Sequence, residues 1–340
     1  MIKEEQDIIK NWSGTVNEPV VSIGCLTYNH EAYIREAINS FLMQETSFPF
    51  EVIIYDDGST DTNRKIISDY AAQYPNIIKT IFPEQNQYQF HKRVNIDFVL
   101  RHARGQYIAI CEGDDYWLDP LKLQKQYEIL ERHTDFDLCL HPAYLLDEMS
   151  QKRVGEIGRY PVDLNHPIIP FEAVVNKPNG QLATASSFFR ASKIPQLKAF
   201  FDESQASIFD IYLHMITAYK QGAYLLHDTM SVYRINVPGS WNSSSAKFGL
   251  DNHVFKRAEA FGYLESFVDE KDRPLLKRAV LNSYLFILKG SFSSRKTKLK
   301  ILKEIGSQLS LVQKIKFRFL ADFNLLHRLI SKLYRLVKRN

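Results

Sequence analysis

The architecture of this chain is set by the segment Gln106-Tyr-Ile-Ala-Ile-Cys-Glu-Gly-Asp-Asp-Tyr-Trp-Leu-Asp-Pro120. Its apolar half, which ends at Cys111, is typical of a buried β-strand, and the acidic half is typical of a loop. Asp119 suits the cap of a helix and Pro120 its first residue, so we expect a helix over residues 121–131. The segment therefore predicts a strand, an acidic loop and a helix in direct succession.

The residues before this segment alternate in the same way between short apolar runs and helical patterns. We expect strands over residues 19–26, 51–55 and 77–82, and helices over residues 31–43, 60–71 and 95–102. Strands that alternate with helices form βαβ units, so we predict a Rossmann-like α/β fold with a mostly parallel central sheet and flanking helices. Right-handed crossovers then bring the loops after the strands to one edge of the sheet, where such folds bind ligands.

The length of 340 residues and a hydrophobic content of 45% fit one large globular domain with an appendage. We expect an N-terminal leader over residues 1–18, the α/β domain over 19–245 and a helical region over 246–340. The first residues lack the basic and apolar pattern of a signal peptide, and no apolar run reaches the eighteen residues of a spanning helix. These patterns predict a protein that is neither secreted nor membrane-spanning.

The three cysteines, Cys25, Cys111 and Cys139, have no spacing typical of a metal site or of paired disulfides. Each lies in an apolar, strand-like run. We therefore expect buried thiols in a reducing compartment.

Acidic residues follow two of the expected strands. Asp56-Asp57 ends one strand and Asp114-Asp115 follows another, with Glu112 close by. Both loops open on the same edge of a parallel sheet, so these carboxylates gather around one crevice and repel one another unless a cation neutralises them. A divalent, oxygen-preferring ion such as Mg²⁺ or Mn²⁺ resolves that conflict. The alternative is that both dipeptides are ordinary turn residues with solvated charge.

Four motifs of the N-terminal half resemble a known family. They are Thr27-Tyr-Asn29, Phe41-Leu-Met-Gln44, Asp56-Asp-Gly-Ser-Thr-Asp61 and the run from Arg104 to Trp117. In this order and at this spacing, over roughly residues 19–240, they closely resemble glycosyltransferase family 2, the inverting nucleotide-sugar transferases of GT-A fold. The resemblance implies a metal-dependent transfer of a sugar from a nucleotide-sugar, expected to be a UDP-sugar, to a hydroxyl group.

The resemblance also implies roles for single residues at the donor site. Thr27, Tyr28 and Asn29 would line the nucleotide pocket, and Asp57 would accept a hydrogen bond from the uracil ring.

In the acidic loop, Asp114 would contact the ribose and Asp115 would hold Mn²⁺ or Mg²⁺ on the diphosphate. Glu112 stands where many members have Asp and is a second candidate ligand. Arg93 is a candidate contact to the diphosphate, although a single basic residue beside a helix is more often solvated.

The family position of the catalytic base, an Asp at the head of a helix, corresponds to Asp210. Its alternative role is an ordinary helix cap. Asp202, Glu203 and Asp228 are the competing candidates for the base.

A sugar-nucleotidyltransferase would share an α/β architecture but needs a Gly-rich, basic loop after the first strand, and Tyr28-Asn-His-Glu31 is not such a loop. A third hypothesis is a non-catalytic protein that binds a sugar nucleotide. The acceptor that the family implies is a growing glycan or a lipid-linked oligosaccharide.

The formal net charge of +4 is distributed unevenly. Residues 291–340 hold thirteen Lys or Arg residues against Glu304 and Asp322, a net charge of +11, which leaves −7 for residues 1–290. The basic tail has no nucleic-acid motif and the body is acidic, so a nucleic-acid partner is not expected.

Within the tail, apolar residues recur every three or four positions from Val312 to Val337, as in an amphipathic helix. Residues 311–340 are therefore candidates for docking on an anionic membrane surface. The alternative is that the apolar stripe packs on the body or on a second copy of the chain in a homo-oligomer. We expect a cytoplasmic protein, and the membrane hypothesis places it at the inner face of the cell membrane.

Overall fold

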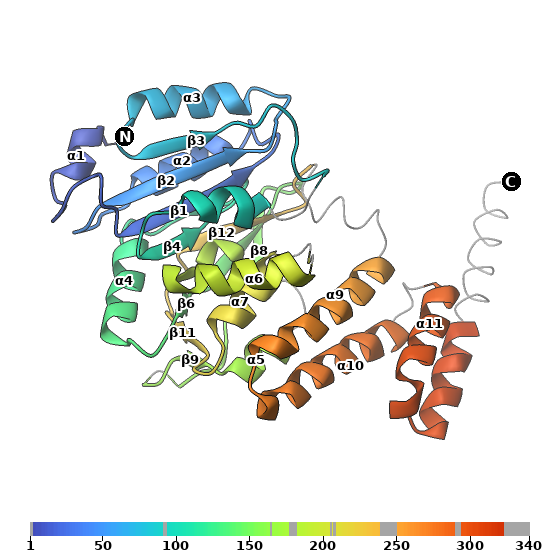
Figure 1. The fold of residues 1–340 in the computed structure, drawn as a ribbon. Coiled ribbons are helices and arrows are strands. Elements are labelled where there is room, and N and C mark those ends of the chain that lie inside the picture. The colour runs from blue at the N-terminus through green and yellow to red at the C-terminus, as the bar shows by residue number, and fades with distance from the viewer. Residues whose placement is uncertain are drawn as a thin grey trace, which may run out of the picture. The chain divides into compact units, whose positions relative to one another are not determined.

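The computed structural model describes residues 3–90, 94–163, 165–176, 182–204, 206, 209–238, 250–289 and 294–322. Its internal contacts divide the chain into two compact units, Met1–Ser243 and Ser244–Asn340. Figure 1 shows the first unit as a sheet with helices packed on it and the second as a set of helices.

The first unit is built on an eight-stranded sheet in the order β3-β2-β1-β4-β10-β6-β11-β9. The strands are β1 (Val21–Thr27), β2 (Phe50–Asp56), β3 (Ile78–Ile81), β4 (Tyr107–Ile110), β6 (Leu138–Leu140), β9 (Ile168–Ile169), β10 (Phe188–Arg190) and β11 (Ala223–Leu225). The first four are parallel neighbours, as the alternating pattern predicts. β10 is antiparallel to both β4 and β6, so the sheet changes direction beside β4.

A second, four-stranded sheet has the order β5-β12-β7-β8. Its strands are β5 (Tyr116–Trp117), β12 (Ser231–Ile235), β7 (Ala143–Asp147) and β8 (Lys152–Ile157). β5 lies inside the segment that the sequence predicted to be loop, and it becomes a strand because it pairs with β12. The acidic residues thus lie between β4 of the large sheet and β5 of the small one.

Helices cover the large sheet and are bounded as follows: α1 (Glu5–Ile9), α2 (Ile34–Leu42), α3 (Asn63–Gln73), α4 (Lys122–Arg132), α5 (Phe171–Asn176), α6 (Ile194–Ser204) and α7 (Phe209–Thr217). α2 forms because Ile34, Ala37, Ile38 and Phe41 recur at helical spacing, and all four are fully buried in the core. The helix predicted over residues 95–102 is instead a short π-helical turn followed by a 3₁₀ turn.

The N-terminal residues contribute to this core. Ile8 of α1 is buried, and the ring of Trp12 meets Phe50 of β2 edge-on at 5.2 Å between centroids. Glu5 accepts hydrogen bonds from the backbone and side-chain amides of Asn76. Residues 5–12 therefore pack as part of the first unit rather than standing apart as a leader.

The second unit consists of α9 (Leu250–Leu264), α10 (Arg273–Lys289), α11 (Arg295–Ile305) and a helical stretch over residues 311–322. Tyr284, Leu288, Ile301 and Phe317 are among the residues of its own apolar core. In the described part of the chain, the helices are all too short or too polar to span a membrane. The three cysteines are free and buried, as expected.

Candidate active site

The acidic loop after β4 is held against the end of β1. The backbone N–H of Cys111 donates to the backbone oxygen of Gly24 at 3.1 Å, and the N–H of Gly113 donates to the backbone oxygen of Leu26 at 2.9 Å. A Cβ atom on residue 113 would lie 2.6 Å from the side chain of Thr27, so only glycine permits this close approach. The position of the loop on the sheet is therefore fixed by its own backbone.

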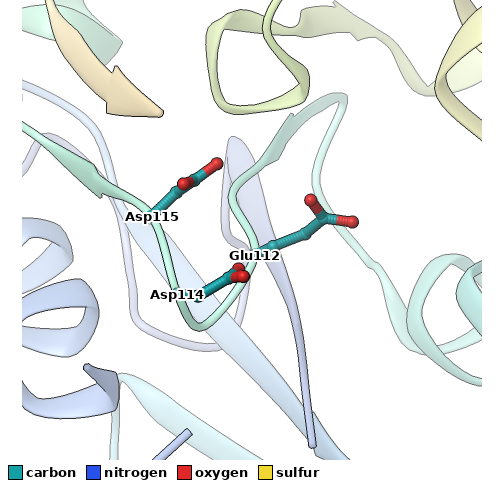
Figure 2. A group of neighbouring side chains, drawn as sticks. All are labelled: Glu112, Asp114 and Asp115. Carbon is teal, nitrogen blue, oxygen red and sulfur yellow. The ribbon is translucent and has the colours of Figure 1, made fainter. Parts of the chain in front are cut away.

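This loop brings three carboxylates together. One oxygen from each of Glu112, Asp114 and Asp115 lies within 4.8 Å of the others, and all three side chains project from the same loop (Figure 2). Asp115 is buried, and its Oδ1 accepts the backbone N–H of Arg234 at 2.8 Å. Its Oδ2 is also buried and has no hydrogen-bond partner among the described residues. A buried, unpaired carboxylate oxygen is costly, so this atom needs a ligand.

The crowding of these groups changes their protonation. Burial, together with the negative charges of Asp114 and Asp210, raises the pKa of Glu112 to about 8. Burial and the charges of Asp114 and Glu112 raise the pKa of Asp115, and the nearby Arg234 opposes that shift. A group of oxygen donors whose charges repel one another fits a hard divalent cation such as Mn²⁺ or Mg²⁺.

Asp210 lies in the first turn of α7, and its negative charge is one of the causes that raise the pKa of Glu112. Of the competing carboxylates, Asp202 is exposed on α6 and pairs with Lys198 at 2.8 Å. α7 thus carries a fourth carboxylate whose charge affects the pKa of Glu112.

The other two competitors are exposed side chains. Asp228 is exposed and pairs with Lys125 at 2.6 Å, and Glu203 is exposed on α6. Neither is among the charges that shift the pKa of Glu112 or Asp115.

Asp57 follows β2 and is buried. Its two oxygens accept the backbone N–H groups of Gln87 at 2.8 Å and Tyr88 at 3.1 Å. Burial raises the pKa of Asp57, and these two hydrogen bonds limit the rise. The adjacent Asp56 accepts from the side chain of Asn63 at 2.6 Å. Asp57 thus binds the segment that follows β3. Its expected contact with a uracil ring stays a prediction.

The residues predicted to line the nucleotide pocket differ in their surroundings. Thr27 is buried beneath the acidic loop and accepts a hydrogen bond from Asn63 at 3.2 Å, whereas Tyr28 is 38% exposed. Asn29 adopts a φ of 54°, and its side chain accepts the N–H of Thr60 at 2.8 Å, which ties the end of β1 to the turn after β2. Arg93 lies outside the described residues.

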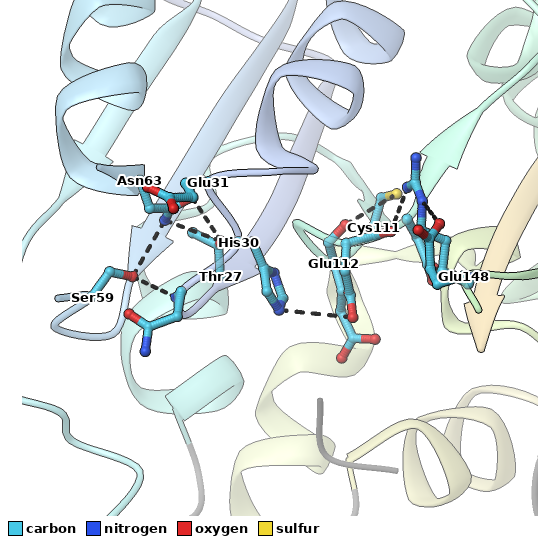
Figure 3. A network of polar contacts seen from close by, with 12 residues as sticks. Thr27, His30, Glu31, Ser59, Asn63, Cys111, Glu112 and Glu148 are labelled. Atoms are coloured by element: carbon cyan, nitrogen blue, oxygen red, sulfur yellow. Dashed lines mark hydrogen bonds and ion pairs between the residues drawn. The ribbon is translucent and has the colours of Figure 1, made fainter. Parts of the chain in front are cut away.

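Two residues at this site carry no local sequence signal. His30 lies between the Thr27 side and the Glu112 side of the polar network (Figure 3), and its Nε2 is 3.7 Å from Asp114 Oδ2. Arg234 of β12 contacts the acidic loop through both its backbone and its side chain. Both contacts depend on tertiary packing, since neither residue belongs to the acidic loop.

The sequence matches the model of the family described as Glycosyl transferase family 2 over residues 22–194. An uncharacterized protein of Mycobacterium tuberculosis (strain H37Rv) is 37% identical over 227 residues, which is 66% of this chain and 61% of that protein. An uncharacterized glycosyltransferase of Nostoc sp. is 39% identical over 127 residues, 37% of each chain. The chain thus matches about three fifths of the length of the mycobacterial relative.

Two solved structures share the fold. Staphylococcus aureus TarS 1–349 in complex with UDP superposes with a TM-score of 0.54 at 15% identity, over 93% of this chain and 91% of that one. The mannosyltransferase PcManGT from Pyrobaculum calidifontis, in complex with GDP-Man and Mn²⁺, superposes with a TM-score of 0.52 at 15% identity. The match covers 91% of this chain and 85% of that one. The expected fold class, a GT-A α/β domain followed by helices, is confirmed by these likenesses. Because the family model covers half of its residues, the chain belongs to glycosyl transferase family 2.

Proposed function

We propose that the chain is an inverting, metal-dependent transferase that moves a sugar from a UDP-sugar to a hydroxyl of a glycan or lipid-linked glycan. The observation that carries the proposal is the group Glu112, Asp114 and Asp115, which includes the buried and unpaired Oδ2 of Asp115. Family membership supports the reaction class. TarS with UDP-GlcNAc and PcManGT with GDP-Man and Mn²⁺ support a nucleotide-sugar donor and a divalent ion.

In this proposal the acidic loop binds the donor. Asp115 and Glu112 hold Mn²⁺ or Mg²⁺, Asp114 accepts from the ribose hydroxyls, and Asp57, which follows β2, orients the nucleobase. When bound, the ion neutralises negative charge on the departing diphosphate. Thr27 supports the loop from below and thereby keeps these carboxylates at the edge of the sheet.

Asp210 is proposed as the base. The acceptor oxygen forms a bond to the anomeric carbon while the bond from that carbon to the diphosphate oxygen breaks. The proton of the acceptor hydroxyl passes to a carboxylate oxygen of Asp210, and UDP leaves. The charge of Asp210 contributes to the raised pKa of Glu112, which supports a base near the proposed metal ligands.

Replacement of the base tests this assignment. We expect Asp210→Asn to lower turnover of a UDP-sugar by about 10²- to 10⁴-fold, because the amide cannot accept the proton, while UDP affinity stays unchanged. The measurements are UDP release in the presence of Mn²⁺ and UDP binding by calorimetry. Asp202→Asn, at an exposed carboxylate of α6, is the matched control and should retain wild-type turnover. Turnover near wild type in Asp210→Asn would show that another group is the base.

Metal binding should depend on pH through Glu112. Its pKa lies above the usual 4.5, so the folded protein retains a proton that the unfolded chain has lost, and stability without the ion falls as pH rises from 4.5 towards 8. The ion displaces this proton, so Mn²⁺ affinity should rise as pH rises from 6 to 8. Calorimetry across pH 6 to 8 measures the slope. The same slope in Glu112→Gln would exclude Glu112 as its source.

The second unit supports peripheral membrane association. Leu311, Val312 and Ile315 of the helical residues 311–322 are 72%, 75% and 63% exposed. On the opposite face, Phe317 and Ala321 are buried, Phe317 as part of the core of that unit. Lys314, Lys316 and Arg318 are also exposed and flank the apolar stripe. We propose that this stripe enters an anionic lipid surface, with the basic tail on the headgroups, at the cytoplasmic face of the cell membrane.

Vesicle sedimentation tests the membrane proposal. The full chain should pellet with vesicles that contain phosphatidylglycerol and less so with neutral ones, and high salt should release it. Leu311→Asp combined with Ile315→Asp should abolish binding, because two charges then enter the apolar stripe. Met149→Asp, which changes an 83% exposed residue of the first unit, is the control and should bind normally. Equal binding by all three proteins would remove the proposal.

A further inference from the structure

Arg234 is a buried arginine beside the acidic loop. It lies on β12, and its side chain is only 4% exposed. Its guanidinium forms ion pairs with Glu36 of α2 and with Glu148, which follows β7; the Nε–Oε1 distance to Glu148 is 2.7 Å. One side chain therefore connects α2, the small sheet and the loop between β4 and β5.

The contacts of Arg234 with the acidic loop are made at two points. Its backbone N–H donates to Asp115 Oδ1 at 2.8 Å, and its Nη1 donates to the backbone oxygen of Asp114 at 2.5 Å. The first contact fixes the rotation of the Asp115 carboxylate, so that Oδ2 is the oxygen left for a ligand. The second fixes the main chain between the two aspartates.

The surroundings of the guanidinium keep it in place. Its central carbon lies 5.1 Å from the ring centroid of Tyr33 and 4.6 Å from that of Tyr116, within the range of cation–π contacts. Glu148 is 10% exposed, so this ion pair is largely shielded from water. Because its charge is already matched by two carboxylates, Arg234 is poorly suited to bind a diphosphate itself.

We propose that Arg234 is a positioning residue that preorganises the acidic loop for the divalent ion. As these three carboxylates ionise, their charges would otherwise drive the loop apart, and the ion would have to gather them on binding. The guanidinium holds the main chain of Asp114 and offsets the charge of Asp115, so the carboxylates stay within ligand distance of one another. This inference rests on the metal site of the proposed function but not on the identity of the sugar.

The test measures Mn²⁺ binding alone, by electron paramagnetic resonance, without nucleotide. Arg234→Lys keeps the charge, but an ammonium group cannot reproduce the planar, multiple contacts of a guanidinium. We expect a 10- to 100-fold loss of Mn²⁺ affinity, the range typical of groups that orient metal ligands. Glu148→Gln, which keeps the arginine but removes one of its anchors, should produce a smaller loss in the same direction.

The matched control is Arg190→Lys. Arg190 is also partly buried, donates to the backbone oxygens of Phe136 and Leu130, and pairs with β4 at its opposite end, beside Tyr107. Arg190→Lys should lower the melting temperature without changing Mn²⁺ affinity. This result would separate a loss of stability from a loss of positioning of the acidic loop.

Wild-type Mn²⁺ affinity in both Arg234→Lys and Glu148→Gln would overturn the positioning role while leaving the metal site intact. An equal loss of affinity in Arg190→Lys would also overturn it, because the effect would then be one of general stability. Absence of Mn²⁺ binding by the wild-type protein would overturn the metal site and, with it, this inference.

Discussion

The confinement of Glu112, Asp114 and Asp115 is the constraint on which the rest of this site depends. Three carboxylate oxygens within 4.8 Å repel one another, and their partial burial removes part of the water that would screen them. The protein offsets this cost in part by holding a proton on Glu112, whose pKa is raised to about 8, and in part by placing Arg234 beside Asp115. A divalent cation is the remaining compensation, and the unpaired oxygen of Asp115 is where it is needed.

The fold supplies the rigidity that such crowding requires. The acidic loop is hydrogen-bonded to the end of β1, and Gly113 allows it to lie directly on Thr27. On its other side, β5 pairs with β12, which brings Arg234 to the loop. The site therefore lies where the two sheets meet, and each sheet fixes one end of the loop. The charge of Asp210, in the first turn of α7, also raises the pKa of Glu112.

Local sequence patterns predicted β1, β2 and β4 because these strands are largely apolar and buried on both faces. They also predicted β3, of which only Ile78 is buried. They did not predict β8, whose residues are largely polar and exposed, or β5, which is a strand only because of its distant partner β12. The acidic loop was found from its composition and its place after β4. Arg234 was not found from the sequence, because a single arginine in a strand gives no local sign of its role. That role becomes visible only when Glu36, Glu148 and the acidic loop are seen to pack around it.

The most direct test of the metal–diphosphate site is the affinity of the wild-type protein for UDP, measured by calorimetry with and without Mn²⁺. If the acidic loop binds the diphosphate through an ion, UDP should bind at least about tenfold more tightly with Mn²⁺ present, and UDP should tighten Mn²⁺ binding by the same factor, since binding free energies are linked. The same UDP affinity in both conditions would contradict the account, because the three carboxylates would then have no part in holding the diphosphate.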